Sequence, residues 1–152
     1  MDIPSRDHFV RHVSTIPAAA GQETEIFVRE RAPDAPSDGR PPIVLVHGGF
    51  WPGTLAFDTP LSGYSLMETL AGAGFATFAP DMIGYGRSSR PMMDDPANLS
   101  PANRTLIGVD PAATPSYPYQ VVNAASERDD LNAVVDFVRA LTKSPKVFLF
   151  GW

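Results

Sequence analysis

The run Ile43-Val44-Leu45-Val46 constrains the fold of this chain more than any other segment. It is apolar at every position and leads directly into His47-Gly48-Gly49. A strand that does not alternate between apolar and polar residues is typical of a parallel sheet, where both faces are buried. The chain is therefore expected to form a sheet that helices cover on both sides.

The segments after this run alternate between helical and extended patterns. Residues 61–73 predict a helix, residues 75–80 predict a strand, and residues 146–150 predict another strand. Because helices connect successive strands, we expect right-handed crossovers and parallel pairing.

The clearest helix precedes the last predicted strand. Its apolar residues are spaced as on one helix face: Leu131, Val134, Val135, Val138 and Leu141. We expect Asn123 or Ser126 to cap its amino end, and Asp129 and Asp130 to lie in its first turn, where negative charge is favourable. Pro145 is expected to end it.

The amino-terminal part predicts a different arrangement. Residues 8–16 and 24–31 alternate in part and are rich in β-forming residues, which indicates an antiparallel pair at the sheet edge. His8 and His12 share a face of the first strand, and we expect them to be exposed. The predicted fold class is thus α/β, a mostly parallel sheet with an antiparallel amino-terminal edge. Five strands and two helices are expected in residues 1–152, all within one domain.

Proline is concentrated in one long segment. Six of the 16 prolines lie between Pro91 and Tyr119, which predicts an irregular loop. Apolar residues make up 43% of the chain, so this is a loop of a globular protein and not part of a disordered one. Loops of this length are often functional.

Composition argues against several classes of protein. There is no cysteine, which excludes disulfides, thiolate zinc sites and a cysteine nucleophile within these residues. The net charge is −5 without a block of like charges, so nothing attracts nucleic acid or an anionic membrane. We predict no metal site, no signal peptide and no membrane span, and hence a cytoplasmic protein. The oligomeric state is left open.

Three motifs follow one another on the predicted elements. A strand leads into His47-Gly48-Gly49-Phe50-Trp51-Pro52-Gly53, the next strand into Pro80-Asp81-Met82-Ile83-Gly84-Tyr85-Gly86-Arg87-Ser88-Ser89, and the last into Gly151-Trp152. In these motifs the chain resembles the α/β-hydrolase family over nearly its whole length. That family has an H-G loop, a D-x-x-G-x-G-x-S turn and a G-x-S-x-G nucleophile elbow in these places. Only the first two residues of the elbow are present here.

The resemblance implies roles for residues around the first motif. The backbone amides of Gly49 and its neighbour Phe50 would form part of an oxyanion hole, which stabilises negative charge on a substrate oxygen. His47 would orient this loop through hydrogen bonds and would not act as the catalytic base. Phe50, Trp51 and Trp152 would line the substrate pocket.

The second motif is expected to be structural. Asp81 would accept backbone N–H bonds that fix the turn around Gly84 and Gly86, and would not be a triad acid. Ser88 and Ser89 are not on a strand-to-helix elbow, so neither is a good nucleophile candidate. The proline-rich segment is either an ordinary surface loop or a further part of the pocket lining, through Met92, Met93, Leu99, Tyr117 and Tyr119.

The resemblance implies a serine hydrolase that cleaves a carboxylic ester, or a thioester or amide, through an acyl-enzyme and without a cofactor. The nucleophile is expected directly after Trp152. Two alternatives stay open: an aspartate-nucleophile haloalkane dehalogenase or epoxide hydrolase, and a non-catalytic binding protein on the same fold. The expected partners are a small ester-like substrate and the rest of the same domain, which would supply the nucleophile, the acid and the catalytic histidine.

Two expectations concern the carboxyl end. Alone, residues 1–152 are not expected to fold stably, because the last strand would expose unpaired backbone along Val147, Phe148, Leu149 and Phe150. The residue after Trp152 is expected to be chemically unusual, for example a modified serine.

Overall fold

The computed structural model describes residues 3–33, 39–61, 63–90, 95–116 and 122–152. Its strands form one sheet in the order β1-β2-β4-β3-β5. Their bounds are Ser5–Val13 for β1, Glu23–Arg31 for β2, Ile43–Val46 for β3, Thr77–Asp81 for β4 and Phe148–Gly151 for β5. β2 pairs antiparallel with β1 and β4, whereas β3 pairs parallel with β4 and β5. The predicted α/β class with an antiparallel amino-terminal edge is confirmed.

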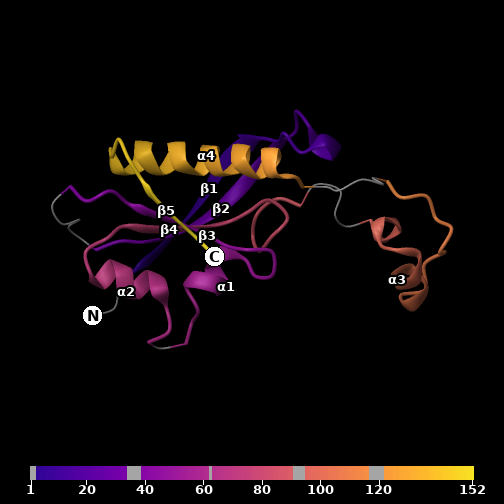
Figure 1. Cartoon of the computed structure of the whole chain (residues 1–152), viewed down its shortest axis with the longest axis horizontal. Coiled ribbons are helices and arrows are strands. Elements are labelled where there is room, and N and C mark those ends of the chain that lie inside the picture. The colour runs from indigo at the N-terminus through magenta and orange to yellow at the C-terminus, as the bar shows by residue number, and fades with distance from the viewer. Residues whose placement is uncertain (1–2, 34–38, 62, 91–94, 117–121) are drawn as a thin grey trace.

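Helices cover both faces of the sheet (Figure 1). On one face, α4 (Ala124–Thr142) packs against β1 and β2. On the other face, α1 (Gly53–Phe57) and α2 (Leu66–Gly72) pack against β4. The chain therefore has the layered arrangement that the buried strand at 43–46 predicts.

Each face of the sheet has its own apolar core, because successive residues of a strand point to opposite sides. Val44 and Phe78 belong to the core under α4, together with Val134 and Val138 of that helix. Leu45 and Ala79 belong to the core under α1 and α2, together with Phe57 and Met67. The last residue of the predicted α4 stripe, Leu141, is instead 45% exposed, because it lies in the wall of a pocket.

The prediction of two helices is wrong, since the described residues form two further short α-helices and two 3-10 turns. The added α-helices are α1 and α3 (Pro101–Leu106), and the turns are η1 (Pro17–Ala19) and η2 (Pro96–Asn98). Neither added helix is long enough to show an apolar period. α3 is held by polar bonds, because the buried Arg104 side chain donates to three backbone carbonyls, those of Leu99, Pro111 and Ala113.

The proline-rich segment is therefore partly ordered. Within it, Leu99 is 41% exposed, and its contact with a substrate stays a prediction. The other residues proposed for the pocket lining from this segment, Met92, Met93, Tyr117 and Tyr119, lie outside the described residues.

Several bounds differ from the predicted ones. β1 begins at Ser5 and ends at Val13, earlier than the predicted 8–16. α2 is shorter than the predicted 61–73, because the Ser65 side chain caps it by accepting a hydrogen bond from Glu68 N. β4 and β5 start later than predicted.

α4 begins earlier than its apolar stripe indicates. The Asn123 side chain accepts hydrogen bonds from the backbone N–H groups of Ala125 and Ser126, and Ser126 Oγ accepts one from Asn123 N. This reciprocal capping box starts the helix at Ala124. Asp129 and Asp130 consequently lie beyond the first turn, where Glu127 is the acidic residue, which corrects their predicted place near the helix terminus. Asp130 is on the face of α4 that packs on the sheet.

The prediction that His8 and His12 are exposed is also wrong, because α4 covers this face of β1. His8 Nε2 lies 2.6 Å from Glu30 Oε2, and its ring lies 5.2 Å from the ring of Phe137 on α4. His12 Nε2 lies 3.1 Å from Asp130 Oδ1, and only 14% of the His12 side chain is exposed.

Asp130 is 1% exposed, and within the described residues its carboxylate oxygens have no hydrogen bond of acceptable geometry. Burial, followed by the charges of Asp129 and Glu127, raises the pKa of Asp130 to about 7. In the unfolded chain the pKa of an aspartate is about 3.9. Between these values the folded chain holds a proton that the unfolded chain releases, so stability falls as the pH rises through this window.

Asp130→Asn is expected to remove this penalty, because an amide keeps the shape and does not ionise. The variant should be more stable than the parent at pH 8, by at most about 4 kcal/mol for a window of this width, and the advantage should shrink toward pH 4. Urea unfolding of the complete domain across this range measures it. Asp136→Asn on the exposed side of α4, where 74% of the Asp136 side chain is exposed, is the control. An Asp130→Asn advantage that does not change with pH would contradict the assignment.

Candidate active site

The glycine loop after β3 lies beside the carboxyl end of β5. Trp152 N donates a hydrogen bond to Val46 O at 3.1 Å, which continues the β3–β5 pairing up to the loop. A Cβ atom at Gly48 would lie 2.8 Å from Trp152 O, closer than real Cβ contacts allow. In Figure 1 the carboxyl end of the chain lies next to β3 and α1. The first and third motifs thus meet at the carboxyl ends of the parallel strands β3 and β5.

His47 connects this loop to the end of β4. The side chain is 8% exposed, and its Nε2 accepts a hydrogen bond from Met82 N at 2.9 Å. Nε2 therefore carries no hydrogen, and Nδ1 donates to Gly48 O at 2.7 Å. The imidazole holds the Gly48 carbonyl in place.

Asp81 is fully buried and joins the loop after β4 to α1. Its Oδ1 accepts from Thr54 N at 3.1 Å and from Thr54 Oγ1 at 3.2 Å. Its Oδ2 accepts from Arg87 N at 3.0 Å. With these donors the carboxylate anchors two loops, and Thr54 is a partner that the sequence reasoning missed.

Ser88 and Ser89 attach the same turn to β2. Ser88 Oγ donates to Asp81 O and accepts from Phe27 N at 2.8 Å. Ser89 Oγ accepts from Glu25 N at 2.9 Å. Both hydroxyl groups are bonded to the backbone of the sheet region, a structural use of these side chains.

The turn after β4 depends on two glycines. Gly84 and Gly86 have φ angles of 94° and 50°, in the left-handed region that glycine adopts most easily. A Cβ atom at Gly86 would lie 1.9 Å from Asp81 Oδ2. Gly84 N donates to Ser89 O at 2.9 Å and closes the turn.

Tyr85 lies between these glycines and reaches the loop after β3. Its hydroxyl donates to Gly49 O at 2.9 Å, and its ring packs edge-on against His47 with centroids 4.8 Å apart. No role was predicted for Tyr85. The only signal was its place inside the second motif, and a spacing alone does not show which loop a side chain contacts.

The amide groups predicted for the oxyanion hole are free. Among the described residues, no acceptor is bonded to the N–H of Gly49 or to that of Phe50. Both amides belong to the loop that adjoins Trp152. An arrangement of backbone donors near a strand end is suited to bind a negatively charged oxygen.

The aromatic residues proposed to line the pocket extend into solvent. Phe50 is 92% exposed, Trp51 65% and Trp152 87%. These three residues lie at the carboxyl ends of the parallel strands, as the free amides do, because they follow β3 and β5. Their contact with a substrate stays a prediction.

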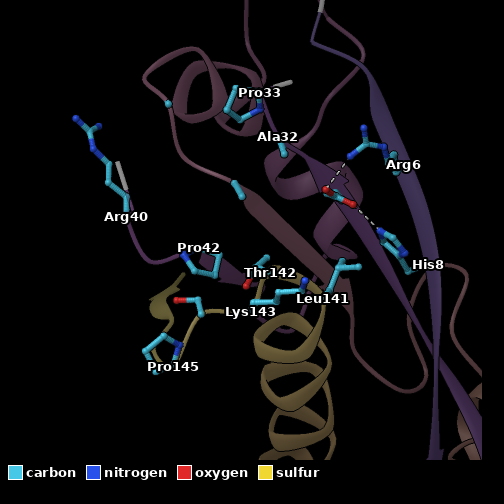
Figure 2. A pocket seen from close by; sticks show the side chains of 15 residues that line it. Arg6, His8, Ala32, Pro33, Arg40, Pro42, Leu141, Thr142, Lys143 and Pro145 are labelled. Carbon is cyan, nitrogen blue, oxygen red and sulfur yellow. Dashed lines mark hydrogen bonds and ion pairs between the residues drawn. The ribbon is translucent and has the colours of Figure 1, made fainter. Parts of the chain in front are cut away.

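A pocket of about 600 Å³ lies elsewhere, at the amino ends of the parallel strands. Pro42 and Pro145, in its wall, precede β3 and β5. Figure 2 shows Arg6 and His8 of β1 on another side of it, with dashed lines to the carboxylate of Glu30. Because Gly48 and Trp152 follow the opposite ends of these strands, this pocket is distinct from the glycine loop.

In the described part of the chain, no three histidine, aspartate or glutamate side chains are grouped to hold a metal ion. None of the helices described there has the length and apolar character needed to cross a membrane.

The sheet, its two helical layers and the glycine loop beside β5 define a protein of the α/β-hydrolase type. Residues 41–152 match the family described as the alpha/beta hydrolase fold, and the chain belongs to this family.

Individual relatives differ in their activities. A haloalkane dehalogenase of Mycobacterium marinum is 39% identical over 61 residues, which is 38% of this chain and 17% of that protein. A thermophilic esterase from Thermogutta terrifontis superposes with a TM-score of 0.54 at 18% identity, over 95% of this chain and 36% of that one. The haloalkane dehalogenase DbeA from Bradyrhizobium elkani superposes with a TM-score of 0.53 at 17% identity, over 97% of this chain and 33% of that one. The chain thus spans about a third of these solved structures, which share its fold.

Proposed function

We propose that residues 1–152 are the amino-terminal part of one hydrolase domain, and that the complete domain is a serine hydrolase acting on a carboxylic ester, or on a thioester or amide. The observation that carries this proposal is the pair of partner-free amides at Gly49 and Phe50, in a loop that adjoins Trp152. Acyl transfer passes through a tetrahedral oxyanion, and one such donor is worth about 3 to 4 kcal/mol of transition-state stabilisation.

In the proposed mechanism a serine directly after Trp152 attacks the carbonyl carbon of the ester. A histidine from the rest of the domain takes the serine proton, and a carboxylate orients that histidine. The carbonyl oxygen becomes negative and accepts hydrogen bonds from the Gly49 and Phe50 side of the loop. The alcohol leaves with a proton from the histidine, and water then hydrolyses the acyl-enzyme.

A second candidate is an aspartate-nucleophile haloalkane dehalogenase, which the 39% identity to the Mycobacterium marinum enzyme favours. An aspartate after Trp152 would displace a halide from carbon and form an alkyl-enzyme ester. The same loop amides would then stabilise the tetrahedral intermediate formed when water attacks this ester.

Reaction of the complete domain with a fluorophosphonate, a p-nitrophenyl ester and a 1-haloalkane separates these candidates. We expect covalent labelling at the residue after Trp152, confirmed by peptide mass, and release of p-nitrophenol. Halide release without labelling would overturn the esterase proposal in favour of the dehalogenase. A domain that is folded but inactive in all three assays would indicate a binding protein.

A further inference from the structure

We propose that Tyr85 is a positioning residue of the oxyanion hole, and that its hydroxyl fixes the direction of the Phe50 amide. This inference rests on the proposed function, since it names a residue that prepares the same site. Its basis is the hydrogen bond from Tyr85 Oη to Gly49 O, 2.9 Å long, which joins the turn after β4 to the loop after β3.

The bond acts on an amide through the planarity of the peptide. Gly49 C=O and Phe50 N–H belong to one peptide unit, and no peptide bond in the described residues is cis. In a trans peptide the C=O and the N–H point in opposite directions. A hydroxyl that holds the Gly49 oxygen therefore directs the Phe50 N–H away from Tyr85.

The preceding peptide unit is held in the same way. His47 Nδ1 donates to Gly48 O, which fixes the direction of the Gly49 N–H. The two loop amides thus each have their carbonyl partner bound by a side chain, one imidazole and one phenol. Oxyanion holes depend on donors set in place before the reaction, because no energy is then lost in reorienting them.

Among the described residues, Tyr85 makes the one hydrogen bond to the peptide that joins Gly49 to Phe50. Phe50 is 92% exposed, so its side chain has little packing to hold the loop. Tyr85, in contrast, is held at both backbone groups and at its ring. Its N–H donates to Met82 O at 2.9 Å, its carbonyl accepts from Ser88 N at 3.0 Å, and its ring packs edge-on against His47 at an interplanar angle of 69°. The hydroxyl transmits this order to the exposed loop.

Tyr85→Phe tests the hydroxyl alone, because phenylalanine keeps the ring that packs on His47. In the complete domain we expect kcat for a p-nitrophenyl ester to fall by about 10- to 100-fold with little change in KM, since the amide is needed mainly in the transition state. Binding of phenylboronic acid, which forms a tetrahedral anion on a serine nucleophile, should weaken by a similar factor. If Tyr85 served folding alone, the variant protein that does fold would keep the parental kcat and the parental affinity for the boronate.

Tyr64→Phe is the matched control. Tyr64 is 77% exposed, and among the described residues its hydroxyl has no hydrogen bond, so its loss should change neither kcat nor boronate binding. If Tyr85→Phe retains the parental kcat and boronate affinity, the positioning role is overturned while the esterase proposal stands. If the parent itself neither hydrolyses the ester nor binds the boronate, the proposed function fails and this inference fails with it.

Discussion

Gly53→Ala is expected to lower the free energy of unfolding of the complete domain by about 3 kcal/mol. Gly53 is the first residue of α1 and is buried against β4. A Cβ atom there would lie 2.2 Å from Pro80 O and 3.0 Å from Pro80 C, both backbone atoms of a central strand. Neither can turn aside as the end of a side chain can, so α1 has to move away from β4.

This movement would also break bonds that hold the site together. Thr54, the next residue, donates its N–H and its hydroxyl to Asp81 Oδ1. A buried carboxylate that loses hydrogen-bond donors is destabilising beyond the steric clash. The effect of Gly53→Ala should therefore exceed that of an ordinary small-to-large change at the surface.

Gly72→Ala provides the control of opposite sign. Gly72 ends α2 on the surface, and a Cβ atom there meets nothing within 4 Å. Alanine favours a helix over glycine by about 0.5 to 1 kcal/mol, so this variant should be slightly more stable than the parent. Urea unfolding compares the two. A Gly53→Ala domain as stable as the parent would show that α1 does not pack on β4 this closely.

Gly48→Ala is expected to reduce kcat of the complete domain by about 100-fold, with a smaller effect on folding. The added methyl group would lie 2.8 Å from Trp152 O, so the loop after β3 and the end of β5 have to separate. These are the two segments that carry the proposed amide donors and lead to the proposed nucleophile. A displacement of a few tenths of an ångström between them weakens bonds that the transition state requires.

The neighbouring glycine gives an internal comparison. A Cβ atom at Gly49 meets nothing nearer than Tyr85 Oη at 3.9 Å, an ordinary contact. Gly49→Ala should therefore lose much less activity than Gly48→Ala, measured by ester hydrolysis at saturating substrate. Equal losses in both variants would argue that loop flexibility, and not the distance to Trp152, governs activity.

The sequence was sufficient to predict the sheet, because burial leaves a strong signature in it. The β3 strand coincides with the predicted 43–46. The antiparallel edge follows from two successive segments rich in β-forming residues, and the parallel core follows from the alternation of strands and helices after them. The short helices could not be predicted this way. α1 and α3 are one to two turns long, and α3 owes its order to the side chain of Arg104, which no apolar periodicity reveals.

The candidate site was predictable in its motifs and not in its contacts. Gly49, His47 and Asp81 could be selected because the motifs that contain them resemble those of the α/β-hydrolase family and directly follow predicted strands. The bond from Tyr85 to Gly49 joins residues from two different loops. Only the three-dimensional arrangement of the turn shows that the phenol reaches that carbonyl. Asp130 is buried because it shares the face of α4 that carries Val134 and Val138, where it meets His12 of β1.

A crystal structure of the complete domain after reaction with a fluorophosphonate tests the oxyanion hole most directly. The bound phosphonyl oxygen stands in for the negative oxygen of the tetrahedral intermediate. We predict that it lies about 2.7 to 3.1 Å from the backbone N of Gly49 or Phe50. An adduct whose oxygen is bound by other groups, with both amides out of hydrogen-bond range, would contradict the role assigned to this loop.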